Sequence, residues 1–162
     1  MDLQIRVADL ADQDAIWDII KNVIKTGNSY VFYPDSSREK MIDYWCSKEK
    51  RTYVAFLGNK LVGTFLIKDN IPDNGSHVAN ASYMIHPDSF GKGIGEAMGK
   101  YSLVEAKKLG YRAMQFNMVI KSNEPAVRLW TKLGFQIVGE IPEAFNHPIN
   151  GYTNAYVMYK KL

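Results

Sequence analysis

The chain has 162 residues, 46% of them hydrophobic and 12% aromatic, with a formal net charge of +3, and this length and composition predict a single domain, residues 1–162, around one core. No apolar run approaches the roughly 20 residues that cross a bilayer, and no basic N-terminal segment precedes an apolar one, so we expect a cytoplasmic protein without a membrane partner. The basic residues are dispersed among acidic ones, which argues against a nucleic-acid partner.

The first 50 residues follow a strand-helix-helix pattern. Residues 3–7 alternate as a half-buried strand, and Asp9 or Asp12 is in place to cap a helix. A second, shorter helix, capped by Ser36 or Ser37, should run through Trp45. The apolar stripe of the first helix consists of Ile16, Ile19, Ile20, Val23 and Ile24.

Two strands, residues 52–57 and 61–67, are predicted to pair through a short hairpin at Gly58. A third strand, residues 78–85, should end near His86, because the proline that follows disfavours helical backbone at that histidine. A helix of roughly four turns should then begin near Gly93. Gly110 stands where a left-handed C-terminal cap is expected.

The remaining chain predicts three strands and one further helix. Residues 112–119 alternate, with Met114, Phe116 and Met118 expected on one face. Residues 137–141 and 153–159 read as a final pair of strands, separated by a long loop at residues 142–152. The single cysteine, Cys46, is expected to be a buried small hydrophobic residue, and the scattered histidines lack metal-ligand spacing, so no metal is expected.

The stretch after the third strand carries glycines at alternate positions, Gly91, Gly93 and Gly95. Such a loop turns tightly and leaves backbone N–H groups at the helix start, where a phosphate binds well. The alternative is a turn that merely joins a strand to a helix. The spacing fits neither the dinucleotide-binding fingerprint nor the nucleoside-triphosphate loop.

These glycines resemble the pyrophosphate loop of the Gcn5-related N-acetyltransferase (GNAT) superfamily, Gln/Arg-x-x-Gly-x-Gly/Ala, with Gly93 and Gly95 at the two glycine positions. Phe90 departs from the first position of that motif. A second block, residues 123–135, is similar to the family's Asn-x-x-Ala…Tyr-x-x-x-Gly-Phe helix, with Trp130 at the tyrosine position. The resemblance covers about residues 50 to 140.

The resemblance implies an α/β fold: a mixed, mostly antiparallel sheet of about six to seven strands with helices on both faces. It also implies an enzyme that transfers acetyl directly from acetyl-coenzyme A, its co-substrate, to an amine. Ile85 N–H stands near the usual position of the donor to the thioester oxygen. The implied cofactor-binding residues are Met84, Ile85, His86, Gly91, Lys92, Gly93, Ile94, Gly95, Glu96, Asn123 and Trp130. Asn123 is alternatively a helix cap, and Trp130, which is no realistic proton donor, is expected to pack against the pantetheine.

The arrangement Phe116-Asn117-Met118-Val119…Asn123, together with Asn80 and Trp130, is similar to that of fungal azetidine-2-carboxylate N-acetyltransferases, which act on a proline-like amine. Asn117 and Asn80 are the candidates that orient the amine, although an asparagine that satisfies strand backbone is the common alternative. Asn28, Tyr30 and Tyr33, in the aromatic loop, are candidates for substrate contact. The general base and acid stay unassigned.

The aromatic loop and the long loop at residues 142–152 favour a covered pocket, and therefore a small-molecule amine as the substrate. One rival is a non-catalytic acyl-coenzyme A sensor, suggested by Phe90 and Trp130. A second rival is a protein N-terminal acetyltransferase, which would need an open groove. A homodimer is compatible with the sequence.

Overall fold

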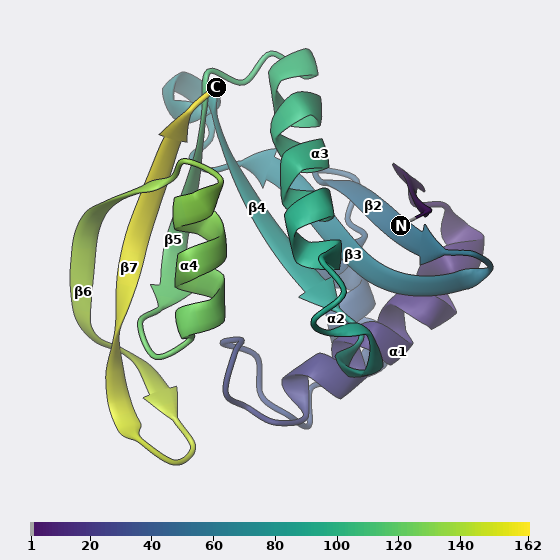
Figure 1. The fold of residues 1–162 in the computed structure, drawn as a ribbon, viewed down its shortest axis with the longest axis horizontal. Helices are drawn as coiled ribbons and strands as arrows, with labels where there is room; N and C mark the ends of the chain where they lie inside the picture. Colours follow the sequence, from purple (N-terminus) through teal and green to yellow (C-terminus); the bar gives the residue numbers. More distant parts are fainter. Residues whose placement is uncertain (1) are drawn as a thin grey trace. The chain divides into compact units, whose positions relative to one another are not determined.

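The structure of the protein, a computed structural model, describes residues 2–162 (Figure 1). Its strands are β1 (Leu3–Val7), β2 (Arg51–Leu57), β3 (Lys60–Asp69), β4 (Val78–Ile85), β5 (Ala113–Ile120), β6 (Gln136–His147) and β7 (Gly151–Lys161). Its α-helices are α1 (Gln13–Ile24), α2 (Arg38–Trp45), α3 (Ile94–Lys108) and α4 (Glu124–Lys132). Short 3-10 turns are η1 (Leu10–Asp12), η2 (Asp73–Gly75) and η3 (Pro87–Ser89).

The strands form one seven-stranded sheet in the order β1-β2-β3-β4-β5-β7-β6. β4 and β5 pair in parallel, with Val78 opposite Ala113 and Ala79 opposite Met114. The pairs β1-β2, β2-β3, β5-β7 and β6-β7 are antiparallel. The predicted sheet, mixed but mostly antiparallel, is therefore confirmed.

The contacts of the chain divide it into two compact units, and β4 and α3 each contribute to both. The first unit contains the residues up to Lys68 together with Ser82–Tyr101. The second contains Asp69–Ala81 and Ser102–Leu162. That residues 1–162 act as a single domain stays a prediction.

The first unit places helices on both faces of its strands. Val54 and Leu66 pack with the buried stripe of α1 and with Met41 and Trp45 of α2. Their neighbours Tyr53 and Phe65 point to the other face, where both rings meet Tyr101 of α3 edge-on at 6.0 and 6.3 Å. The predicted apolar stripe is buried at every position: Ile16, Ile19, Ile20, Val23 and Ile24.

In the second unit, α4 covers the sheet through an aromatic cluster. The ring of Phe116 lies 4.4 Å from that of Phe135 and 4.6 Å from that of Trp130. The predicted alternation of β5 holds through Phe116 and then fails, because the register with β7 shifts between Phe116 and Val119. Met118, expected on the same face as Met114 and Phe116, is consequently 40% exposed, while Val119 is buried.

The prediction of a long loop at residues 142–152 is wrong. β6 continues to His147, and β7 already begins at Gly151. The residues between Ile141 and Phe145, which interrupt the alternating pattern, lie in a register shift between β6 and β7. Within this shift, Glu143 N–H donates to Asn154 Oδ1 at 3.0 Å. Cys46, expected to be buried, is half-buried.

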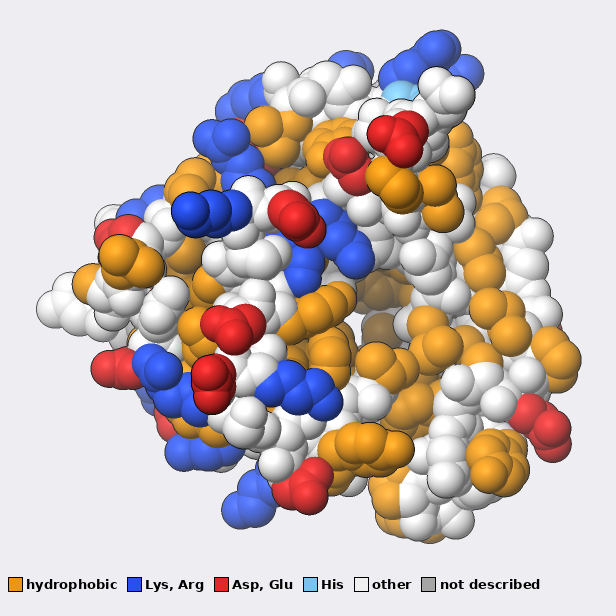
Figure 2. All heavy atoms as spheres, turned by 180° about the vertical axis from the view of Figure 1, so that it is seen from behind, with side chains coloured by type: hydrophobic (Ala, Val, Ile, Leu, Met, Phe, Trp, Pro, Cys, Tyr) orange, Lys and Arg blue, Asp and Glu red, His pale blue; other side chains and the backbone are white. Residues whose placement is uncertain are grey.

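β6 lies at the edge of the sheet and exposes Ile137, Val138 and Ile141. Figure 2 shows the molecule from behind, with the β6-β7 side on the right. Hydrophobic side chains gather along this side, and lysine and arginine are scarce there. No helix in residues 2–162 is long and apolar enough to span a membrane.

Asp12 anchors the start of α1 to β1, and its removal should lower stability in a pH-dependent way. Its carboxylate accepts hydrogen bonds from Arg6 at 2.7 and 2.8 Å, and the hydrogen bond with Arg6 holds its pKa below the ordinary value. A carboxyl group whose pKa is lower in the folded than in the unfolded chain stabilises the fold at pH values above the unfolded pKa of about 3.9. This stabilisation is lost as the pH falls through the folded-state pKa.

We therefore expect Asp12→Asn to lower the melting temperature by about 4 °C near pH 7, and by much less near pH 2.5. Thermal denaturation at both pH values measures the difference. An equal loss at both would contradict the assignment to this ion pair.

Candidate functional site

The junction between β4 and α3 is built as the glycines predict. His86 caps η3, and its Nδ1 accepts a hydrogen bond from Asp88 N–H at 3.3 Å. Gly91 and Gly93 then take φ angles of 75° and 72°, which side chains disfavour. No atom lies within 4 Å of a Cβ built on either glycine, so this backbone is open to a ligand.

The charges around this loop suit an anion. The N-terminal end of a helix directs N–H groups outward, and the helix dipole adds about half a positive charge there. Lys92 is exposed, and its Nζ donates to Asp88 O at 3.2 Å. Glu96, in the first turn, pairs with Lys100 at 2.8 Å, which offsets its negative charge. A phosphate group fits this set of donors.

The residues that flank the loop differ in exposure. Met84 is 1% exposed, so only its main chain can reach a ligand. Ile94 is equally buried and anchors the start of α3. Phe90, at the motif position usually held by a polar residue, is 62% exposed and contributes no polar group. The His86 ring lies 3.5 Å from Asp18 and 3.7 Å from Asp88.

The three substrate candidates of the aromatic loop lie in different surroundings. Tyr30 reaches β4, where its hydroxyl accepts from Tyr83 N–H at 2.9 Å and donates to Tyr83 O at 2.5 Å. Burial raises the pKa of the Tyr30 hydroxyl, which therefore stays protonated. Tyr33 is 75% exposed, and exposed Asn28 accepts a hydrogen bond from Thr26 Oγ1. The structure thus brings only Tyr30 to the β4 backbone.

The two asparagines that are candidates to orient the amine belong to a cluster of four carboxamides in the second unit. Asn80 Nδ2 donates to Gln115 O at 2.9 Å and so links β4 to β5. Exposed Asn117 donates to Asn70 Oδ1 at 2.7 Å and accepts from Gln115 Nε2 at 2.9 Å. Sequence reasoning missed Asn70 and Gln115 as partners of Asn117. Nothing in the turn pattern around Asn70 indicated this contact, which joins positions 47 residues apart.

The two residues predicted from the second motif both have protein partners. Asn123 caps α4, and its side chain accepts from Ala126 N–H at 3.4 Å. Trp130 is only 8% exposed and packs with Phe116 and Phe135. The cap that was the alternative for Asn123 is therefore present.

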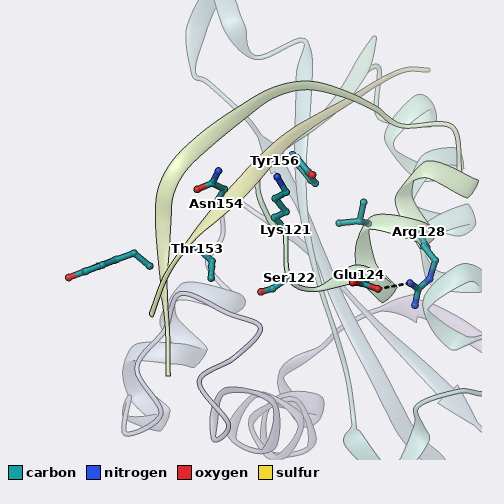
Figure 3. A pocket seen from close by; sticks show the side chains of 9 residues that line it. Lys121, Ser122, Glu124, Arg128, Thr153, Asn154 and Tyr156 are labelled. Carbon is teal, nitrogen blue, oxygen red and sulfur yellow. Dashed lines mark hydrogen bonds and ion pairs between the residues drawn. The ribbon is translucent and has the colours of Figure 1, made fainter. Parts of the chain in front are cut away.

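A separate open cavity of about 740 Å³ lies in the second unit, beside α4 and β7 (Figure 3). Its charges are already paired: Arg128 with Glu124 at 3.1 Å, and Lys121 with Glu140 at 2.7 Å. The hydrogen bond to Glu140 raises the pKa of Lys121, which stays cationic. Sequence analysis assigned no role to the lining residues, which are Lys121, Ser122, Glu124, Val127, Arg128, Tyr152, Thr153, Asn154 and Tyr156. Residues 2–162 contain no cluster of His, Cys, Asp or Glu side chains that could hold a metal ion.

Comparison with known proteins shows the family of the chain. The family model described as "Acetyltransferase (GNAT) family" matches residues 17–135. A GCN5-related N-acetyltransferase from Kribbella flavida is 36% identical, with a TM-score of 0.94 and coverage of 99% of this chain and 98% of that one. A phosphinothricin acetyltransferase from Sinorhizobium meliloti, solved in complex with acetyl-coenzyme A, has a TM-score of 0.88 over 100% of this chain and 89% of its own, but at 19% identity it shows the fold alone.

Among curated proteins, the N-acetyltransferase aca1 of Schizosaccharomyces pombe is 35% identical over 98 residues. The match covers 60% of this chain and 47% of the yeast protein. A second match, Protein SPT10 of Saccharomyces cerevisiae, is 27% identical and is covered over only 15% of its length. The chain thus spans half or less of the curated relatives that it matches.

The capping bond predicts how substitutions of Asn123 affect stability. Asn123→Ala removes an N-cap and should lower the free energy of unfolding by about 1 kcal/mol. Asn123→Ser keeps a capping oxygen, so its free energy of unfolding should fall by only a small part of that amount. Urea denaturation of both variants measures the two losses. Equal losses in the two variants would show that the side-chain oxygen does not cap α4.

Proposed function

Because the chain belongs to the acetyltransferase (GNAT) family, we propose that it transfers acetyl from acetyl-coenzyme A directly to the amine of a small molecule, in the first instance a small amino acid or proline analogue. The observation that carries the proposal is the exposed loop of left-handed glycines that leads from β4 into α3. Residues 1–162 would act as one acetyltransferase domain, in the cytoplasm.

In this proposal the first unit holds the cofactor. The backbone N–H groups from Gly91 to Glu96 bind the pyrophosphate, and Lys92 adds a positive charge beside them. Main-chain groups of Met84, Ile85 and His86 pair with the pantetheine arm. The open space around Gly91 and Gly93 supports this assignment, because phosphate oxygens can approach the backbone without meeting side chains.

The chemical step needs two further contributions. Negative charge develops on the thioester oxygen, and Ile85 N–H would stabilise it by roughly 3 kcal/mol, judged from the loss of single oxyanion donors in other enzymes. The amine must also be neutral: at pH 7 this costs about 4.6 kcal/mol for an amine with pKa near 10.4, and about 1 kcal/mol for one near 7.8. The lower value is that of a peptide N-terminus, so a small amino acid or proline analogue needs more help with deprotonation, from a base that we leave unassigned.

Asn117 is the residue proposed to orient the acceptor amine. Its exposed amide is held by Asn70 on one side and by Gln115 on the other, so its direction is fixed before a substrate arrives. Asn80 would act beside it, although the amide hydrogen bond from Asn80 to Gln115 O equally serves the sheet. The resemblance to azetidine-2-carboxylate N-acetyltransferases supports a small cyclic amine as the acceptor.

A homodimer is also part of the proposal. β6 is the edge strand and exposes Ile137, Val138 and Ile141, and edge strands with apolar side chains tend to pair. Sedimentation equilibrium would show a mass of twice 18.4 kDa if this is right, and the mass of one chain if it is not.

Substitution of Gly93 tests the cofactor loop. Gly93→Asp places a carboxylate against the proposed pyrophosphate and should weaken coenzyme A binding at least about tenfold in titration calorimetry. Gly110→Asp is the matched control, because Gly110 also has a positive φ and open space but lies at the far end of α3. If both variants bind coenzyme A as wild type does, the loop assignment is wrong.

The function itself is tested by release of free coenzyme A from acetyl-coenzyme A over a panel of amines. The panel contains proline analogues, other amino acids, polyamines and peptide N-termini. We expect turnover with small amino acids or proline analogues, because the resemblance to azetidine-2-carboxylate N-acetyltransferases points to such acceptors. Turnover confined to peptides would favour a protein N-terminal acetyltransferase, and tight binding without release would favour an acyl-coenzyme A sensor.

A further inference from the structure

Two lysine ammonium groups meet one aromatic ring near the end of α2. Lys50 Nζ lies 3.3 Å from the centroid of the Tyr44 ring, and Lys68 Nζ, from β3, lies 6.0 Å from the same centroid. Lys50 also donates a hydrogen bond to Tyr44 O. Within residues 2–162, neither ammonium forms an ion pair with a carboxylate. The two cations therefore share one ring without an anion to balance them.

The ring itself brings no negative charge to the pair. Burial raises the pKa of the Tyr44 hydroxyl, which is neutral near pH 7. The ring also packs edge-on against Phe32, with 5.1 Å between the centroids, which holds it in place. A partly buried ammonium beside a second cation loses some of its hydration and is repelled by its neighbour. Both effects favour the neutral amine.

Lys50 is the member of the pair that is set up to lose its proton. It is half-buried in the turn that joins α2 to β2, where its main-chain N–H donates to Ser47 O at 3.0 Å. Burial, and then the charge of Lys68, lower the pKa of Lys50 to about 8, although Glu49 opposes the shift. At pH 7.5 an amine with such a pKa is neutral in about one molecule in four, against about one in 800 for an amine near 10.4.

The other nucleophile of this turn does not compete with Lys50. Cys46 is half-buried, and burial, followed by the charge of Asp12, raises the pKa of its thiol. The thiolate and not the thiol is the nucleophile. Near neutral pH an electrophile that reaches the turn therefore meets a protonated thiol and a partly neutral amine.

We propose that Lys50 is a modification site, at which the neutral amine takes the acetyl group of acetyl-coenzyme A directly from solution, without help from the glycine loop. The nitrogen attacks the thioester carbonyl and forms the amide C–N bond, the C–S bond breaks, and the departing thiolate takes up the proton that the nitrogen releases. The resulting amide is uncharged and retains one N–H, which can keep the hydrogen bond to Tyr44 O. Acetylation thus removes one of the two like charges from the ring.

Competition within one peptide tests the site. The protein is incubated with acetyl-coenzyme A at pH 7.5 and digested with chymotrypsin, and cleavage after Trp45 and Tyr53 leaves Lys48 and Lys50 on the same peptide. Tandem mass spectrometry then gives the two rates, with exposed Lys48 as the internal standard. Lys50 should be acetylated at least about tenfold faster, which allows for the lower nucleophilicity of a less basic amine. The ratio should fall at least about fivefold at pH 9.5, where ordinary lysines also begin to lose their protons.

Two variants and a competitor separate the cause of this reactivity from general accessibility. Lys68→Gln removes the neighbouring charge and should slow acetylation of Lys50 about threefold at pH 7.5. Lys60→Gln, at the opposite end of β3, is the matched control and should leave the rate unchanged. An excess of free coenzyme A, which competes for any cofactor site, should leave it unchanged as well.

Equal rates at Lys48 and Lys50, a ratio that does not change with pH, or a wild-type rate in Lys68→Gln overturns the proposal. Inhibition by free coenzyme A also overturns it, because the acetyl group would then come from bound cofactor. Turnover of small amines is measured separately. A chain that turns over no amine but is acetylated at Lys50 in this pattern refutes the proposed function and leaves the modification site standing.

Discussion

The structure depends on how β4 satisfies its backbone hydrogen-bonding groups. A buried N–H or C=O without a partner is costly, so each position along the strand needs one. The strand meets this need in three ways: β5 pairs with it at Val78 and Ala79, β3 accepts from His86 at its end, and the Tyr30 hydroxyl serves Tyr83. A side chain thus does at Tyr83 what a neighbouring strand does elsewhere.

This arrangement connects the fold to the proposed chemistry. The same strand that carries Ile85 leads through η3 into the glycine loop, so one continuous stretch of chain carries both the proposed oxyanion donor and the proposed phosphate site. Buried anchors on either side, Met84 and Ile94, hold that stretch in place. In the proposed function, substrate selection is assigned to residues that the motif does not contain, such as Asn117 and its partners.

Much of this could be predicted because the decisive signals are local. Gly91, Gly93 and Gly110 adopt the left-handed angles that their positions imply, and the stripe of α1 is buried as its period requires. The errors occur where distant pairing overrides the local pattern. At the register shift after Phe116, the sequence keeps alternating but the exposure of the side chains no longer does. Pairing of Phe145 with Thr153 keeps a segment rich in turn residues in strand conformation. The contacts of Tyr30 with Tyr83 and of Asn117 with Asn70 arise from the tertiary fold, which no spacing in the sequence encodes.

The central claim is that the β4 end and the glycine loop hold acyl-coenzyme A, and a crystal structure of the chain with acetyl-coenzyme A tests it most directly. The account predicts pyrophosphate oxygens on the N–H groups from Gly91 to Glu96 and the thioester oxygen on Ile85 N–H. A pyrophosphate bound instead in the cavity beside Lys121 and Arg128 would contradict it.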